Sequence, residues 1–150
     1  MSPAELEHYL HEQIPLSKAM AVAVVSVTGD NVLLQAPLGP NINHHETVFG
    51  GSAAALALLA GWSLLHVRLR DEGIANRVVI QRHSMEFERP ITGQFTARAL
   101  LEQPDQWRRF TAMLARRRKA RVIVTCVLER AGELVGTLRG EFVALGATAV

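Results

Sequence analysis

The strongest constraint on the fold is a stretch of 21 residues, 47–67, that contains no Asp, Glu, Lys or Arg. About 20 apolar residues can span a membrane as a helix, but this stretch is rich in Gly, Ala and Ser, carries His66 and lies between strand-like segments. A helix at the centre of a folded domain must also be apolar all round, because every face of it is covered. We therefore predict a buried central helix over residues 51–70, ended by Gly73, and no membrane partner.

The segments on either side of this helix have the pattern of β-strands. Strands are predicted at residues 19–28, 31–37, 76–88, 94–102, 121–130 and 133–145. The pairs Gly29-Asp30 and Ala131-Gly132 indicate tight turns, which favour antiparallel pairing. A single apolar helix needs a sheet to wrap it. The expected fold class is therefore α+β, with an antiparallel sheet around one long helix.

Two short helices complete the predicted pattern. Ser2-Pro3-Ala4-Glu5 is a capping box with proline at the first helical position, and Leu6 and Leu10 follow at helical spacing until Pro15. A second helix begins near Pro104, and three apolar residues share one of its faces: Trp107, Phe110 and Leu114.

Size and charge exclude several classes of protein. The 150 residues, 49% of them apolar and 20% charged, predict one folded domain over residues 1–150 rather than a disordered chain. Cys126 is the single cysteine, so no internal disulfide can form, and a reducing cytoplasm is the expected compartment. The acidic residues Glu5, Glu7 and Glu12, which precede the first apolar run, do not fit a secretory signal. A net charge of only +2 argues against a nucleic-acid partner.

The densest polar cluster stands immediately before the central helix. Residues 41–47 contain two Asn, two His and one Glu, and they run into Phe49-Gly50-Gly51-Ser52. Ser52 can cap the helix, and the two glycines let another group approach the backbone closely. The exposed N–H groups and the helix dipole favour a negative oxygen there, such as an oxyanion of acyl transfer or a phosphate. The alternative is that this segment only turns the chain and caps the helix.

The histidines of this cluster are weak candidates for a metal site. His44, His45 and Glu46 are consecutive, whereas metal ligands need spacings that place side chains on one face, so no metal and no cofactor are expected. Because His44 and His45 are adjacent, we expect their side chains to point in different directions and at least one to be solvated.

Four further residues, Ser52, His66, His83 and Cys126, are weak candidates for catalysis. Gly50-x-Ser52 lacks the second glycine of a nucleophile elbow, so a serine hydrolase is disfavoured. His66 and His83 are more often partly buried structural histidines than catalysts. Cys126, in an apolar run, is expected to be an inert core residue.

Residues 40–52, Pro-Asn-Ile-Asn-His-His-Glu-Thr-Val-Phe-Gly-Gly-Ser, together with Leu59-Ala60-Gly61-Trp62, resemble the thioesterase family named after the C-terminal domain of the YiiD proteins. Residues 87–93 are similar to the aromatic-x-x-Pro-x-x-Gly turn of hot-dog proteins, and residues 118–122 to the start of their penultimate strand. The resemblance covers nearly the whole chain. It implies the hot-dog fold, an acyl-CoA or acyl-carrier-protein (acyl-ACP) substrate, and a homodimer or dimer of dimers whose active sites use both subunits.

The resemblance also implies roles for individual residues. Hot-dog thioesterases of the phenylacetyl-CoA group carry an Asn six residues before a His-Gly-Gly at the helix start, and Asn43 stands six residues before Phe49. Asn43 therefore matches the residue that handles the attacking water. Gly50 matches the glycine whose N–H polarises the thioester carbonyl, and Gly51 is next to it.

This chain departs from that pattern at two positions. Phe49 replaces the histidine, and Leu58 stands where those enzymes carry an acid on the helix. If the chain hydrolyses thioesters, its base must come from elsewhere, and the candidates are Glu46, His44, His45 and His83. We also expect four side chains to contact the substrate: Thr47, Phe49, Ser52 and His83.

A basic segment lies in the second half of the chain. No acid occurs between Gln106 and Leu128, where seven cations stand: Arg108, Arg109, Arg116, Arg117, Arg118, Lys119 and Arg121. Solvated surface charge explains such a segment, and so does recognition of CoA phosphates, because guanidinium groups match phosphate geometry. On the second interpretation Arg116 and Arg118 bind substrate. Nucleic acid fits less well, since Trp107 and Phe110 look like core anchors rather than stacking platforms.

These observations predict an acyl thioester hydrolase that orients a water with a polar loop and holds the oxyanion at the helix start. A non-catalytic acyl-ligand-binding or regulatory module is the first alternative, and the missing helix acid favours it. A hot-dog dehydratase or hydratase is a weaker alternative. The acid that such an enzyme pairs with a loop histidine falls on Leu59, 14 residues after His45.

Overall fold

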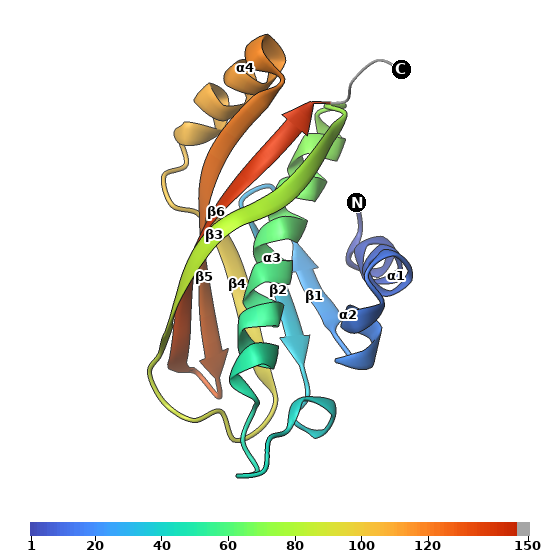
Figure 1. The fold of residues 1–150 in the computed structure, drawn as a ribbon. Coiled ribbons are helices and arrows are strands. Elements are labelled where there is room, and N and C mark those ends of the chain that lie inside the picture. Colours follow the sequence, from blue (N-terminus) through green and yellow to red (C-terminus); the bar gives the residue numbers. More distant parts are fainter. Residues whose placement is uncertain (147–150) are drawn as a thin grey trace.

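One long helix occupies the middle of the molecule (Figure 1). The computed structural model describes residues 1–146, and in it α3 (Gly50–Asp71) has 22 residues. By length and composition α3 could also cross a membrane; in this fold a sheet wraps it, and residues such as Ala53, Leu56 and Leu64 are buried. The prediction of a wrapped central helix is confirmed, with its start and its end each one residue beyond the expected bounds.

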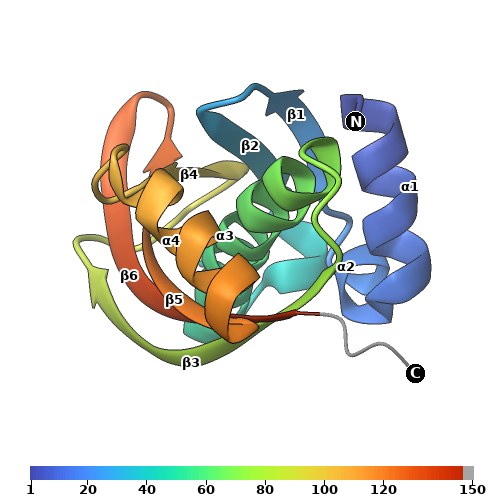
Figure 2. The ribbon, with the colours of Figure 1, turned by 90° about the horizontal axis from the view of Figure 1, so that it is seen from above.

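Six antiparallel strands form one sheet around α3. The strands are β1 (Ala23–Val27), β2 (Asn31–Ala36), β3 (Asn76–Phe87), β4 (Phe95–Leu101), β5 (Lys119–Arg130) and β6 (Glu133–Gly146). Their order is β1-β2-β4-β5-β6-β3, and each neighbouring pair is antiparallel. Seen from above, the sheet curves around α3, with β1 and β3 as its two edges (Figure 2). The α+β prediction is therefore confirmed.

Small residues on α3 let the sheet approach the helix closely. β2 and β4 alternate buried and half-buried positions, as strands with one face on the core do. On the helix, a Cβ at Gly61 would lie only 3.1 Å from the ring of Phe142, which is buried. Burial of one such aromatic ring contributes about 1.5–3 kcal/mol. The Gly- and Ala-rich composition of the helix is therefore a packing requirement.

The N-terminal helix α1 (Pro3–Gln13) has the predicted capping box. Ser2 Oγ accepts a hydrogen bond from the Glu5 N–H at 3.1 Å, and Glu5 Oε2 accepts one from the Ser2 N–H at 2.7 Å. Leu6 and Leu10 are fully buried, as their helical spacing predicts. α1 lies on the side of α3 that the sheet leaves open (Figure 2).

The predicted strand over residues 19–28 is wrong at its beginning. A short helix, α2 (Pro15–Ala19), comes first, and β1 starts only at Ala23. Pro15 has the φ angle of a first helical residue, and Ser17 Oγ donates to the Ile14 carbonyl at 2.8 Å. The apolar composition of this segment did not distinguish a strand from a buried helical turn.

Three aromatic rings join α1 to α3. The Tyr9 ring lies 4.7 Å from that of His66 and 6.2 Å from that of Trp62, centroid to centroid, and the rings of Trp62 and His66 are 4.7 Å apart. Burial lowers the pKa of His66, and the positive charge of Arg70 lowers it further. The neutral imidazole is thus the form that fits this stack.

α4 (Gln106–Arg117) lies beside β5, near the C-terminal end of α3 (Figure 1). The three apolar residues predicted to share one face are all buried: Trp107, Phe110 and Leu114. Trp107 Nε1 donates to Glu72 Oε1 at 2.8 Å, and the Arg68 guanidinium lies 4.2 Å from the centroid of its ring. These contacts fix α4 against the end of α3.

Candidate functional site

A small hairpin leads the chain into α3. After the 3₁₀ turn η1 (Gly39–Asn41), Ile42 pairs with Val48, and the Asn43 N–H donates to the Thr47 carbonyl at 2.8 Å. The polar cluster of residues 41–47 is therefore an ordered hairpin, whose backbone bonds fix the direction in which the chain enters the helix.

Asn41 anchors this hairpin to the rest of the molecule. Its side chain is buried, and Nδ2 donates to the carbonyl oxygens of Met20 at 3.0 Å and Pro37 at 2.8 Å. Its own carbonyl accepts the Phe49 N–H at 2.8 Å. The first asparagine of the polar cluster thus has a structural role that the sequence did not indicate.

Asn43 holds the tip of the hairpin. Its Oδ1 accepts the backbone N–H groups of His45 at 2.8 Å and Thr47 at 3.2 Å, and its Nδ2 donates to Thr47 Oγ1 at 2.9 Å. An asparagine amide has two N–H groups, so one of them has no partner within residues 1–146. Most of the hydrogen-bonding capacity that the sequence assigned to a water is occupied by the loop itself.

The start of α3 leaves two backbone donors open. Phe49 is the N-cap, and its carbonyl accepts the N–H groups of Ser52 at 2.9 Å and Ala53 at 3.1 Å. The expectation that Ser52 caps the helix is wrong, because it lies within the first turn and its side chain makes no cap bond. Throughout the described part of the chain, the N–H groups of Gly50 and Gly51 have no hydrogen-bond partner. Both lie at the positive end of the helix dipole.

Two exposed phenylalanine rings flank this glycine pair. A Cβ at Gly50 would lie 3.6 Å from the ring of Phe87, and a Cβ at Gly51 would overlap the ring of Phe49. The rings of Phe49 and Phe87 are 58% and 56% exposed. Gly51 is therefore required for the Phe49 ring to lie where it does, and the open donors sit between two apolar groups.

A cleft of about 390 Å³ opens beside the glycine pair. It is lined by the hairpin at Thr47, by Ala53 of α3, and by the segment from Phe87 through Glu88 to Ile91. Glu88 is the acidic residue among those that line this cleft, and it is exposed; its sequence pattern did not mark it as a site residue. The only signal in the sequence was its place in the aromatic-x-x-Pro-x-x-Gly turn.

The bases that the sequence predicted in the hairpin lie at its exposed tip. His44, His45 and Glu46 are all exposed, and Glu46 has a left-handed backbone with φ of 64°. The rings of His44 and His45 lie 3.8 Å apart, so the expectation that they point in different directions is wrong.

A β-bulge decides which way His83 points. The register of β3 against β6 shifts between Ile80 and Arg82, so that Ile80 lies opposite Phe142 and His83 opposite Gly140. Phe142 and Gly140 are both buried on the side of the sheet that faces α3. His83 therefore shares that side with Ile80, although the two are an odd number of residues apart. It lies between the glycine pair and the middle of α3.

Arg116 and Arg118 lie at the opposite end of α3 from the glycine pair. The Arg118 carbonyl accepts the Gly146 N–H at 2.9 Å, and Gly146 pairs with Asn76 at the first residue of β3. Gly50 faces Phe87 at the last residue of β3. A helix of 22 residues is about 33 Å long, so these two arginines do not meet the predicted oxyanion site within one chain.

The remaining reactive groups do not form a site. Burial raises the pKa of the Cys126 thiol to about 12, and its Sγ lies 3.1 Å from the Ala57 carbonyl, as expected for an inert core residue. Within residues 1–146, no group of three His, Cys, Asp or Glu side chains is arranged to hold a metal ion.

Comparison with known proteins gives one family over almost the whole chain. The model of a family described as "Putative thioesterase (yiiD_Cterm)" matches residues 3–146. Among solved structures, a protein of unknown function from Chlorobaculum tepidum is 25% identical with a TM-score of 0.89, over 97% of this chain and 98% of that chain.

Two further structures have the same fold. A protein described as the putative thioesterase from Shewanella oneidensis is 26% identical with a TM-score of 0.85, over 95% of this chain and 96% of that one. A Pseudomonas aeruginosa protein described as a probable thioesterase is 22% identical with a TM-score of 0.83, over 97% of both chains.

Proposed function

The chain belongs to the thioesterase family whose model it matches, and from that premise we propose that it hydrolyses acyl thioesters at the start of α3. The hot-dog fold and the neighbouring thioesterase structures support this class of reaction. The acyl group is carried on CoA or on an acyl carrier protein. Water adds to the thioester carbonyl, the carbon–sulfur bond breaks, and an acid and a thiol leave.

The two open N–H groups of Gly50 and Gly51 carry this proposal. When water adds to a thioester, its carbonyl oxygen gains negative charge. Backbone donors that are already in place, at the positive end of a helix and beside an open cleft, stabilise that charge without rearranging. A side-chain cap could have satisfied the Gly51 N–H, and here no side chain caps the helix.

For the base we favour Glu88 over the hairpin residues. Glu88 lines the cleft with Thr47, and the neighbouring Arg89 is bound to Glu133 at 2.8 Å rather than to Glu88. Glu46 and His45 lie at the tip of the hairpin and do not line this cleft; all three side chains are exposed, so the cleft is what distinguishes Glu88. A carboxylate in the cleft can take the proton of a water that stands between it and the thioester carbon. Asn43 then positions the hairpin through its hydrogen bonds to His45 and Thr47.

Hydrolysis of acyl-CoA and acyl-ACP substrates, followed through the released thiol, tests the function. We expect turnover by the purified protein, and we expect Glu88→Gln to lower kcat by about 10²-fold or more and to alter the acidic limb of its pH profile. Glu46→Gln is the matched control and should leave both nearly unchanged. If Glu46→Gln lowers kcat and Glu88→Gln does not, the base is Glu46. If the pH profile is unchanged in both variants, the base is His83. Absence of hydrolysis with every chain length overturns the proposal.

We further propose that the active form is a homodimer joined along β3. This strand is an edge of the sheet, and its Val79, Ile80 and Phe87 side chains are exposed. A twofold axis would pair β3 antiparallel with the same strand of a second copy. Light scattering after gel filtration tests this. Val79→Asp should give a monomer, whereas Val25→Asp, at an equally exposed position on β1 at the opposite edge of the sheet, should not.

Such a dimer changes which glycine pair the basic segment of residues 106–128 can reach. Antiparallel pairing of β3 turns the Asn76 end of one copy toward the Phe87 end of the other, so the partner's basic segment approaches the glycine pair. Replacing Arg116 and Arg118 by Gln should then raise KM for acyl-CoA and spare acyl thioesters of N-acetylcysteamine, which lack the nucleotide. Equal effects on both substrates would contradict a role in phosphate binding.

A non-catalytic acyl-ligand-binding module is the second candidate. The observation in its favour is that α3 carries no carboxylate between Gly50 and Val67, with Leu58 where related enzymes carry an acid. Reversible binding of acyl-CoA without release of thiol would favour this module.

A further inference from the structure

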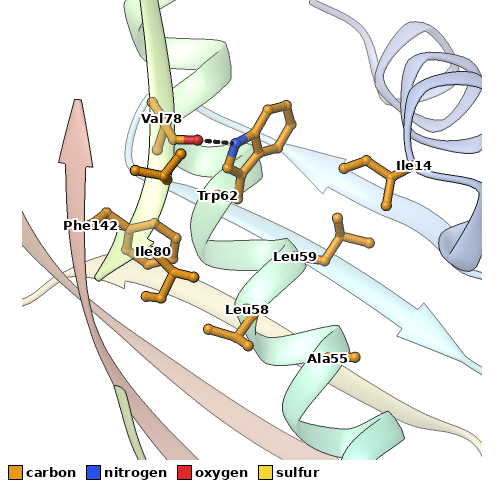
Figure 3. A pocket seen from close by; sticks show the side chains of 9 residues that line it. Ile14, Ala55, Leu58, Leu59, Trp62, Val78, Ile80 and Phe142 are labelled. Atoms are coloured by element: carbon orange, nitrogen blue, oxygen red, sulfur yellow. Dashed lines mark hydrogen bonds between the residues drawn. The ribbon is translucent and has the colours of Figure 1, made fainter. Parts of the chain in front are cut away.

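An apolar groove follows the face of α3 that the sheet leaves open (Figure 3). Ala55, Leu58 and Trp62 form its floor, Ile80 and Phe142 lie on the β3 side, and Ile14 lies on the side of the N-terminal helices. Its volume is about 440 Å³, and no ionisable side chain lines it. This size is within the range of sites that hold small molecules.

The groove begins where the proposed oxyanion site ends. Gly51, Ala55, Leu58 and Trp62 are separated by four, three and four residues, which places them in one stripe along the helix. The exposed ring of Phe49 covers Gly51 at the beginning of this stripe. An acyl group whose carbonyl oxygen meets the glycine N–H groups can therefore follow this stripe of α3 to the groove, which begins at Ala55.

Trp62 closes the far end of the groove. Its indole extends from α3 toward β3, and Nε1 donates to the Val78 carbonyl at 3.1 Å (Figure 3). On its other side the indole is stacked against the His66 imidazole at 4.7 Å. The ring is thus held between a hydrogen bond and a stack, and it forms a fixed end wall.

We propose that this groove binds the hydrocarbon chain of a linear, medium-chain acyl thioester, and that Trp62 sets the longest chain that fits. This inference rests on the proposed function, because it takes the thioester carbonyl to lie at the glycine pair. At 1.5 Å per residue, Leu58 lies about 10 Å and Trp62 about 16 Å along the helix from Gly51. With carbon–carbon bonds of about 1.5 Å, an extended chain advances about 1.3 Å per carbon, so acyl chains of about 8 to 12 carbons fit.

The groove also explains the departure at Leu58. A carboxylate at this position would place a charge among apolar walls, and a hydrocarbon chain bound there would remove its water. Leu58 instead offers apolar contact area to the chain. The position that carries an acid in related enzymes is thus a specificity-determining position in this one, which agrees with a base in the cleft at Glu88.

Binding of non-hydrolysable S-alkyl-CoA thioethers tests the groove independently of catalysis. Isothermal titration with butyl, octyl, dodecyl and hexadecyl thioethers should show affinity rising about twofold to fourfold per methylene up to dodecyl, with no further gain for hexadecyl. Leu58→Trp should remove at least about tenfold of the advantage of dodecyl over butyl and leave butyl binding unchanged. Met113→Trp, at an exposed position on α4, is the control and should change nothing.

Two further variants keep the groove testable if Leu58→Trp fails to fold. Ile80→Trp narrows the groove from the strand side and should repeat the effect of Leu58→Trp. Because Ile80 also lies on the proposed dimer edge, light scattering verifies that this variant keeps the oligomeric state of the wild type. Trp62→Leu opens the end wall and should let hexadecyl bind more tightly than dodecyl. Circular dichroism of each variant verifies the fold.

The outcomes separate the groove from the proposed function. Chain-selective binding of the thioethers without any hydrolysis of thioesters supports the groove and removes the enzymatic function. Hydrolysis with equal affinity for all chain lengths, or with no response to Leu58→Trp and Ile80→Trp, overturns the groove and leaves the function. If Leu58→Trp changes the oligomeric state by light scattering but not the affinity, the groove is a contact between two copies, and the inference fails.

Discussion

The backbone hydrogen-bonding groups at the two ends of α3 differ in whether they have partners. At the C-terminal end the carbonyls of Arg68, Leu69 and Arg70 accept N–H groups from the residues that follow, at 2.8–3.1 Å, and Gly73 turns the chain with φ of 70°. At the N-terminal end no side chain caps the helix, and the N–H groups of Gly50 and Gly51 have no partner in residues 1–146.

Charge follows the same division. The last turn of α3 carries Arg68 and Arg70, which suit the negative end of the helix dipole, while the first turn carries no acid to suit the positive end. Arg68 is also stacked on Trp107. One end is therefore satisfied by the protein itself, and the other keeps its donors for a ligand. The two ends of α3 should therefore respond differently to mutation, the C-terminal end in stability and the N-terminal end in turnover.

The sharpest test removes one donor at the open end. Gly50 is the first helical residue, where proline is tolerated because its missing N–H has no partner in the helix. We expect Gly50→Pro to lower kcat by about 10²–10³-fold, as the loss of one oxyanion donor does. Gly50→Ala keeps the N–H, and its Cβ would be in ordinary contact with Phe87 at 3.6 Å. Equal activity of the two variants in a thioesterase assay would contradict the oxyanion role.

A smaller effect is expected from the hairpin that holds the open end. Asn43→Ala removes three hydrogen bonds of the loop, and we expect kcat to fall by roughly 10- to 100-fold through misplaced donors. Asn43→Asp keeps an oxygen that can accept from the His45 and Thr47 N–H groups, and Thr47 Oγ1 can donate to it. This variant should retain activity. Steady-state kinetics on both variants give the comparison, and an inactive Asn43→Asp would show that the amide N–H itself is needed.

A mutation at the C-terminal end of α3 should affect stability and not turnover. Trp107→Phe removes the hydrogen bond to Glu72 and weakens the contact with Arg68. We expect the free energy of unfolding to fall by about 1–2 kcal/mol, measured by urea denaturation, with kcat unchanged. A loss of turnover as large as that of Gly50→Pro would mean that the two ends are not independent.

The smallest expected effect is a pH dependence in the second half of α3. The pKa of His66 is lowered in the folded state by burial and by Arg70, so below pH of about 6.5 the unfolded chain binds the proton more readily. His66 should therefore stabilise the fold fully above that pH and lose this contribution as the pH falls. Denaturation midpoints of wild type and His66→Phe, compared across pH, should diverge on acidification; parallel curves would contradict the assignment.

Local patterns in the sequence determined the elements. The capping box of Ser2 and Glu5, the uncharged run of α3 and the tight turns between strands depend on neighbouring residues, so they could be found without a structure. The same is true of the glycine pair, because residues at consecutive positions stay together in any fold. The segment around Pro15 was the exception, since an apolar run there suits a strand and a helical turn equally.

Tertiary structure decided what surrounds those elements. Glu88 and Thr47 line one cleft. The β-bulge between Ile80 and Arg82 turns His83 toward α3. Arg118 lies at the opposite end of α3 from Gly50. Each of these facts depends on strand order and register across tens of residues, which periodicity within a strand does not encode. The sequence also does not show whether the polar side chains of the hairpin bond to its own backbone or to a ligand, because this depends on the path of the backbone. The sequence alone therefore determined which groups are present at the start of α3, and the wrapped sheet determined which of them face one another.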